Sequence, residues 1–246
     1  MIDLEKIAQD YHLAPQSDMF IENICQEYEL KWVRELIPKG SKVLELGFGD
    51  GITFRNLAQY CDLSVVEGSK LIVKKAHEVA LELNVKPKIY ESFFETFDSD
   101  EKFDFVFASH VLEHVEEPGE ILKKMKVWLA PGGKGIVIVP NSESIHRRLA
   151  VLMGLQPELD TLSPRDYLVG HLRVFNLNSL ENLLITNQWQ ILEKRGFFFK
   201  PLSNSQMEKF DSSIIQSFCD ISSQLPPEQC ANLALVISGN EREIKD

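Results

Sequence analysis

The chain lacks the features that mark membrane-spanning and secreted proteins. No stretch among its 246 residues approaches the roughly 18 uninterrupted apolar residues of a membrane helix. The segment Met1 to Lys6 carries acids instead of the basic region that opens a secretion signal. We find no internal repeat and no low-complexity tract. These absences lead us to expect a cytoplasmic protein that does not bind a membrane.

Basic residues and cysteines are also few. The 26 Lys and Arg against 37 Asp and Glu give a formal charge of −11, which repels phosphate polyanions. Nucleic-acid binding would need a local basic patch that outweighs this negative charge, so we expect the protein not to bind nucleic acid. The cysteines lie far apart without CxxC spacing, which argues for free thiols and against a zinc site. They are Cys25, Cys61, Cys219 and Cys230.

What the chain has is an ordinary globular composition, 44% hydrophobic and 26% charged, and an alternation of strand and helix patterns. Helical spacing separates successive short β-branched and aromatic runs. Because parallel strands need crossover helices and are buried on both faces, this pattern predicts an α/β fold with a doubly wound parallel sheet. The predicted strands are Val43–Leu46, Leu63–Glu67, Lys88–Glu91, Phe103–Ala108 and Gly135–Val139.

We expect a single domain, residues 1–246, whose segments have different roles. Residues 1–38 form a helical lead-in, and residues 39–140 form the ligand-binding core. Residues 141–177, of mixed polarity, form a lid over the carboxyl edge of the sheet, where open α/β folds bind ligands. Residues 178–246 hold a helix and two late strands without a tight crossover, which predicts an antiparallel addition at one sheet edge.

The predicted strand Val43–Leu46 runs into a glycine-rich turn, Gly47-Phe48-Gly49-Asp50-Gly51, that opens a helix. Glycine lets the backbone turn sharply and approach a ligand, and the helix start presents unpaired N–H groups. This context is typical of nucleotide-like ligands. Glu45 precedes the first glycine, where it would repel a pyrophosphate and favour a cationic ligand.

Glu67 ends the next predicted strand. A carboxylate at this place can accept both hydroxyls of a ribose. The alternative is an acid stabilised by the start of the following helix, with Ser69 as the helix cap. The neighbouring glycine turn favours the ribose role.

These residues resemble the class I S-adenosylmethionine-dependent methyltransferases. Glu45–Gly51 matches their first motif, Glu67 their ribose-binding acid, Phe103–Val115 their fourth-strand motif and Leu129–Gly133 the turn before the fifth strand. The resemblance covers residues 40–140 in unbroken order. It implies a Rossmann-like, seven-stranded sheet of order 3-2-1-4-5-7-6 with strand 7 antiparallel, S-adenosylmethionine as cofactor and S-adenosylhomocysteine as product.

The resemblance also implies which residues hold the cofactor. Glu45 and the glycines would line its methionine half. Many relatives carry an Asp where this chain has Ser92, so we expect Phe93, Phe94 and main-chain groups to hold the adenine. The cofactor contacts so implied are Glu45, Gly47, Gly49, Gly51, Glu67, Gly68, Ser92, Phe93, Phe94 and Ser109.

Two histidines follow the fourth predicted strand. His110 is expected near the sulfonium, either as a base or as a strand-end histidine bonded to the backbone. Glu113 and His114 come next, and we expect His114 to be structural. Some relatives, the ubiquinone-type O-methyltransferases, use a metal near this region. One His/Glu cluster without further carboxylates leads us to predict no metal here.

Histidine and arginine concentrate in the lid, at His146-Arg147-Arg148, Arg165-Asp166-Tyr167 and Gly170–Phe175. One interpretation is a solvated helix face. The other is closure over a substrate with an anion or several hydroxyls, in which arginine binds the anion and histidine accepts a proton. Small-molecule methyltransferases carry a similar pattern in this region, which favours the second interpretation.

The preferred hypothesis is methyl transfer from S-adenosylmethionine to an oxygen or nitrogen of a small metabolite, with a homodimer as a possible assembly. A macromolecule methyltransferase is disfavoured by the acidic charge. A non-catalytic cofactor-binding regulator is the third hypothesis, since a fold never proves activity. The residues predicted to act are the bases His171, His146 and His110 and the substrate contacts Arg147, Tyr167 and Arg173.

Overall fold

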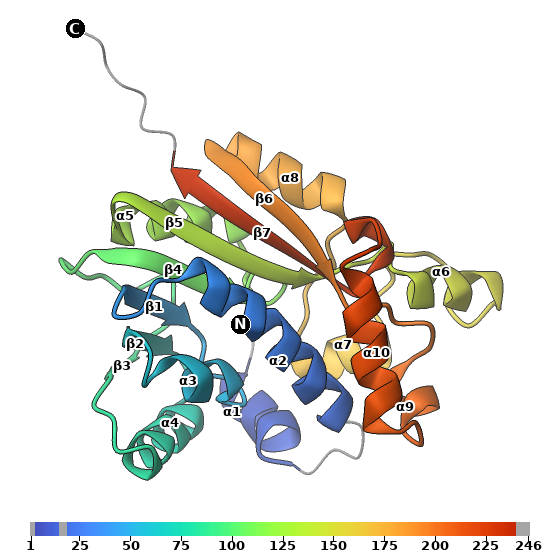
Figure 1. The fold of residues 1–246 in the computed structure, drawn as a ribbon, viewed down its shortest axis with the longest axis horizontal. Helices are drawn as coiled ribbons and strands as arrows, with labels where there is room; N and C mark the ends of the chain where they lie inside the picture. Colours follow the sequence, from blue (N-terminus) through green and yellow to red (C-terminus); the bar gives the residue numbers. More distant parts are fainter. Residues whose placement is uncertain (1–2, 15–18, 240–246) are drawn as a thin grey trace, which may run out of the picture.

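A seven-stranded sheet of order β3-β2-β1-β4-β5-β7-β6 forms the centre of the molecule in a computed structural model, which describes residues 3–14 and 19–239 (Figure 1). Neighbouring strands are parallel from β3 through β5, and β7 is antiparallel to both β5 and β6. The predicted fold class and strand order are therefore confirmed. The strands are β1 (Lys42–Leu46), β2 (Asp62–Glu67), β3 (Lys88–Glu91), β4 (Phe103–Ser109), β5 (Leu129–Pro140), β6 (Trp189–Phe197) and β7 (Asn232–Gly239).

Helices cover both faces of the sheet because its central strands are apolar on both sides. One buried cluster, which includes Trp128, joins the sheet to α5 (Pro118–Trp128) and α8 (Leu177–Thr186). A second joins the opposite face to α2 (Met19–Leu36), α3 (Ile52–Leu57) and α4 (Lys70–Glu82). The predicted crossover helices are thus present, and they hold the strand ends rigidly.

The N-terminal lead-in is helical and lies against the core. It comprises α1 (Leu4–Ile7), the π-helical turn η1 (Ala8–His12) and α2. The Glu5 carboxylate accepts hydrogen bonds from the Lys70 N–H at 2.7 Å and the Ser69 hydroxyl at 3.1 Å, which fastens α1 to the start of α4. The predicted lead-in also includes residues 1–2 and 15–18, which lie outside the described residues, as do residues 240–246.

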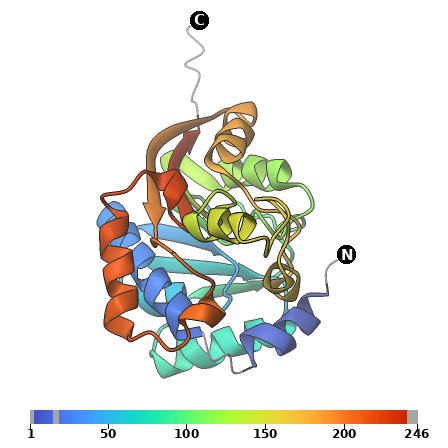
Figure 2. The same cartoon turned by 90° about the vertical axis from the view of Figure 1, so that its right-hand side faces the viewer.

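The remaining helices lie at the carboxyl edge or beside it. Figure 2 faces this edge and shows α6 (Ile145–Leu152) and α7 (Pro164–Val169), both in yellow tones, lying over it. Beyond β6, the helix Ser212–Ser222 packs an apolar face against α2. No helix in the described part of the chain is both long and apolar enough to span a membrane. These helices are α6 (Ile145–Leu152), α7 (Pro164–Val169), α9 (Asn204–Met207), α10 (Ser212–Ser222) and η2 (Pro227–Gln229).

Gly51, the N-cap of α3, meets two requirements that only glycine satisfies. Its φ is +81°, and a Cβ at this position would lie 2.6 Å from the Phe48 ring. Gly40 has the same φ but open space around the place of a Cβ. Gly40→Ala should cost about 1–2 kcal/mol through backbone strain alone. Gly51→Ala should cost a further 1–3 kcal/mol or so through overpacking.

Urea unfolding of the two variants checks this prediction. Equal destabilisation by the two substitutions would mean that Phe48 moves aside freely and that the turn is not tightly packed.

Candidate active site

A cavity of about 910 Å³ opens at the carboxyl edge of the sheet. Its lining comes from the ends of β1, β2, β4 and β5, from the lid and from the N-terminal segment. Every cofactor contact expected from the sequence lines it, and so do His110, His146, His171 and Arg147. The structure therefore brings the expected cofactor residues and three of the expected lid residues, His146, Arg147 and His171, to one space.

The glycine turn is held to β2 by hydrogen bonds. The Gly47 N–H donates to the Val66 carbonyl at 2.8 Å, and the Phe48 N–H donates to Glu67 Oε2 at 3.0 Å. Glu67 Oε1 accepts from the Ser69 N–H at 2.8 Å, while the Ser69 hydroxyl caps α4 by accepting from the Ile72 N–H. Glu67 thus orders the turn and faces the cavity, and its contact with a ribose stays a prediction.

Glu45 is a buried acid near the carboxyl end of β1. Its side chain is 3% exposed, and Oε2 has no hydrogen-bond partner among the described residues. Burial, helped by the neighbouring charge of Glu67, raises the pKa of Glu45 well above its ordinary value. A cationic group entering the cavity would supply the missing partner. This fits the expected position of Glu45 beside the methionine half of the cofactor.

The opposite wall is formed by residues after β3. The Ser92 N–H donates to the Glu67 carbonyl at 3.0 Å, and the Ser92 hydroxyl turns back to the Phe93 carbonyl. Phe93 is 46% exposed, which leaves its ring available for stacking. Gly68 lies beneath, where a Cβ would stand 3.4 Å from that ring and 2.7 Å from Leu4 Cδ1.

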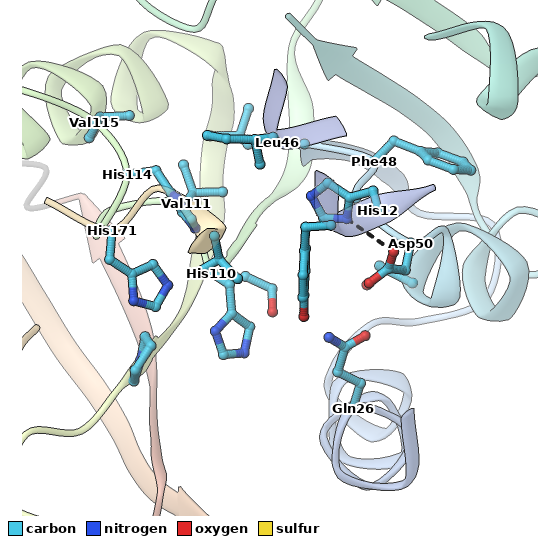
Figure 3. Close-up of a pocket in the computed structure, with 18 of the residues that line it drawn as sticks. His12, Gln26, Leu46, Phe48, Asp50, His110, Val111, His114, Val115 and His171 are labelled. Atoms are coloured by element: carbon cyan, nitrogen blue, oxygen red, sulfur yellow. Dashed lines mark hydrogen bonds and ion pairs between the residues drawn. The ribbon is translucent and has the colours of Figure 1, made fainter. Parts of the chain in front are cut away.

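Sequence reasoning missed the N-terminal cover of this cavity. Leu4, Ile7, Tyr11 and His12 line it, and His12 Nδ1 lies 3.0 Å from Asp50 Oδ1 of the glycine turn (Figure 3). No motif marks these residues. Helical spacing alone could not have placed them against a turn nearly forty residues away.

His110 lies between two buried carboxylates. Its Nδ1 is 3.3 Å from Glu113 Oε1, and its Nε2 is 3.8 Å from Glu29 Oε2. Burial alone would lower the pKa of His110, but the two carboxylates outweigh it and raise the pKa to about 10. A histidine that already carries its proton at neutral pH is a poor base, although it can hold charge and donate hydrogen bonds.

The pKa of His146 is shifted in the opposite direction from that of His110. Its Nδ1 lies 3.0 Å from the Ser144 hydroxyl, and its ring lines the cavity. Burial, with the charges of Lys200 and Arg147, lowers the pKa of His146 far below its ordinary value. A neutral imidazole this reluctant to accept a proton is a weak base.

His171 has the arrangement of an oriented base. Its Nδ1 lies 2.8 Å from Asp166 Oδ1, which orients the ring, and its Nε2 lies 3.9 Å from Glu113 Oε1. Asp166 Oδ2 accepts from Arg147 Nη2 at 2.7 Å and from the Ser163 hydroxyl at 2.7 Å. Although burial opposes it, the pKa of Asp166 falls below its ordinary value because of His171 and Arg147.

One group of side chains in the described residues could hold a metal. Single ligand atoms of Glu113, His114 and His171 lie within 4.8 Å of one another. Within the described residues, neither oxygen of Glu113 accepts a hydrogen bond of good geometry, although His110 Nδ1 lies 3.3 Å from Oε1. The Nδ1 atoms of His114 and His171 are turned to the Gly170 carbonyl and to Asp166. Two imidazoles and a carboxylate form a donor set that suits a divalent transition metal. The expectation of no metal stays a prediction.

Two predicted substrate contacts lie elsewhere. Tyr167 is 68% exposed and is absent from the cavity lining, because α7 turns this side chain to solvent. Arg173 is also absent from the lining, and its guanidinium donates to the carbonyls of Leu112, Val115 and Glu116. It braces the segment after β4. The structure therefore places both side chains outside this cavity, and their contact with a substrate stays a prediction. Arg147 does line the cavity and pairs with Asp166.

Comparison with known families matches residues 11–194 to the family described as a methyltransferase domain. The chain belongs to this family. The resemblance to class I S-adenosylmethionine-dependent methyltransferases is thereby confirmed, and with it the cofactor.

The relatives of this methyltransferase domain are distant. The ubiquinone biosynthesis O-methyltransferase of Coxiella burnetii is 29% identical over 144 residues, which cover 54% of this chain and 60% of the relative. The chain thus spans less than two thirds of that protein. The mitochondrial protein of the same name from Schizosaccharomyces pombe is 25% identical over 194 residues, 76% of this chain and 70% of the relative. The CcbJ methyltransferase of Streptomyces caelestis shares the fold, with TM-score 0.60, 16% identity and 96% coverage of both chains.

Glu67→Ala should weaken binding of S-adenosylmethionine by about 1.5–3 kcal/mol, the worth of hydrogen bonds to a charged group. Isothermal titration measures the affinity. Glu91→Ala is the matched control, because Glu91 pairs with Glu67 in the register of β2 and β3 but does not line the cavity. An affinity within twofold of the unmodified protein for Glu67→Ala would remove the ribose role and leave Glu67 as a structural acid.

His146 should make the protein less stable in acid. Its pKa is lowered in the folded state. Below about pH 6.5 the unfolded chain therefore binds a proton that the folded chain does not bind, and the free energy of unfolding decreases as the pH decreases. His146→Asn should therefore abolish about 1–2 kcal/mol of the stability loss between pH 7 and pH 5. Urea unfolding at both pH values measures this. The exposed His77 provides the control variant His77→Asn, which should behave like the unmodified protein.

Proposed function

We propose that this chain transfers the methyl group of S-adenosylmethionine to an oxygen or nitrogen of a small metabolite. The observation that carries the proposal is the shared cavity, which the glycine turn, Glu45 and Glu67 line at one end and the lid histidines at the other. A cofactor and an acceptor bound there would lie side by side, as methyl transfer requires.

The cover over the cavity favours a small acceptor. The lid and the N-terminal segment meet at the lining, where the Arg165 guanidinium of α7 lies over the Tyr11 ring of η1. A formal charge of −11 disfavours RNA as the acceptor. The names of the relatives, ubiquinone biosynthesis O-methyltransferases, further support a small acceptor with a hydroxyl group.

The chemistry asks little of the protein beyond positioning. The sulfonium of the cofactor is already activated, so holding the acceptor in line supplies most of the acceleration. A hydroxyl acceptor must also lose its proton, and His171 Nε2, oriented through Nδ1 by Asp166, is the group arranged to take it. His110, held as an imidazolium, would instead position the acceptor. Location in the cytoplasm and assembly as a homodimer stay predictions.

Incubation of the purified protein with isotope-labelled S-adenosylmethionine and separate metabolite, RNA and protein fractions tests the proposal. Label should appear in the metabolite fraction, and mass spectrometry should show a gain of one methylene there. Label in RNA or protein alone would overturn the proposal, and cofactor binding without transfer to any fraction would favour the regulator. Parallel assays with a chelator and with added divalent cations examine the Glu113 cluster.

His171→Gln should lower kcat roughly a hundredfold to ten-thousandfold, the contribution of a general base, and should spare cofactor affinity. His77→Gln, at an exposed position, is the matched control. Thermal unfolding of both variants verifies that they fold. Normal turnover by His171→Gln would show that no histidine base is needed and would favour an amine or carboxylate acceptor.

A further inference from the structure

The acceptor end of the cavity contains a lysine without a partner. Lys200 lines the cavity and, within residues 3–14 and 19–239, makes no hydrogen bond or ion pair. The arginines beside it are engaged, since Arg165 lies 2.7 Å from Glu22 and Arg147 lies 2.7 Å from Asp166. Each of these carboxylates already faces an arginine, so the charge of Lys200 is available to a ligand.

The position of Lys200 follows from the sheet. β6 is parallel to β5, because both are antiparallel to β7, and its carboxyl end therefore lies at the edge where the cavity opens. Burial lowers the pKa of Lys200, although Glu22 and Cys25 act in the opposite direction. A half-buried ammonium without a partner among the described residues is stabilised when an anionic group binds beside it.

The cavity that Lys200 lines also carries apolar side chains. Phe198 lies two residues before Lys200, and Ile21, Val169 and Ala231 line the same cavity. Such a lining suits an acceptor with an apolar body, and an aromatic ring is one such body.

We propose that Lys200 binds a carboxylate or phosphate group of the methyl acceptor. The inference rests on the proposed function and names its substrate class. It assigns the anion contact to Lys200, a residue after β6, in place of the lid arginines Arg147 and Arg173.

Simple aromatic probes test the anion contact without knowledge of the natural acceptor. The protein with bound S-adenosylhomocysteine is titrated with benzoate, phenyl phosphate and neutral benzamide, and NMR shifts give the dissociation constants. At least one of the two anions should bind tenfold more tightly than benzamide, and the comparison of the two distinguishes a carboxylate from a phosphate. Lys200→Met should weaken the preferred anion about 10- to 100-fold, as expected for a charged hydrogen bond.

Two further variants make the test specific. Lys200→Arg should recover part of the anion preference. Lys124→Met removes another lysine of the lining, whose ammonium donates to the Phe97 carbonyl at 2.9 Å, and should keep the preference. Equal binding of all three probes, or a preference that survives Lys200→Met or disappears equally in Lys124→Met, would overturn the inference.

Failure of the anion-binding test can be distinguished from failure of the proposed methyl transfer. Methyl transfer to small molecules without an anion preference would overturn only the role of Lys200. An anion preference that depends on Lys200, together with failure of all methyl transfer, would support the anion site and overturn the proposed function.

Discussion

The common direction of β1, β2, β4, β5 and β6 is the constraint on which the rest of the structure depends. Parallel strands end at the same edge, and each strand end here delivers a group to the cavity. Glu67 comes from β2, His110 from β4 and Lys200 from β6, although these residues lie far apart in the chain. The helices on both faces pack against the strands and fix their relative positions. The geometry of the site therefore depends on the packing of the core.

Buried ion pairs then orient the groups that the sheet brings together. The carboxylates of Glu29 and Glu113 face His110, and Asp166 joins Arg147 to His171. Such pairs add little net stability, because each charge must lose its water. Removal of one partner is costly, however, so they favour a single arrangement of the lid over the sheet. In this site most charge serves to orient other side chains, and little of it is left for a ligand.

The fold and the cofactor half of the site could be predicted from the sequence, because local sequence patterns encode both. The glycine turn, Glu67 and the alternation of strands and helices depend on neighbouring residues. The acceptor half depends on contacts between distant segments, so arginines that looked like substrate clamps, Arg173 among them, instead satisfy backbone carbonyls. Lys200 could have been found from the predicted sheet alone, since it follows a late strand that ends at the carboxyl edge.

The place of β7 has a consequence for how the protein is made. This strand comes last in the described chain, yet it lies between β5 and β6 and supplies Asn232 to the cavity. During synthesis, which proceeds from the N-terminus, β5 and β6 therefore keep unpaired edges until β7 has left the ribosome. The nascent chain can assemble its glycine turn early, but the acceptor end cannot close before the final strand is inserted. Until that moment the open edges are its main route to aggregation.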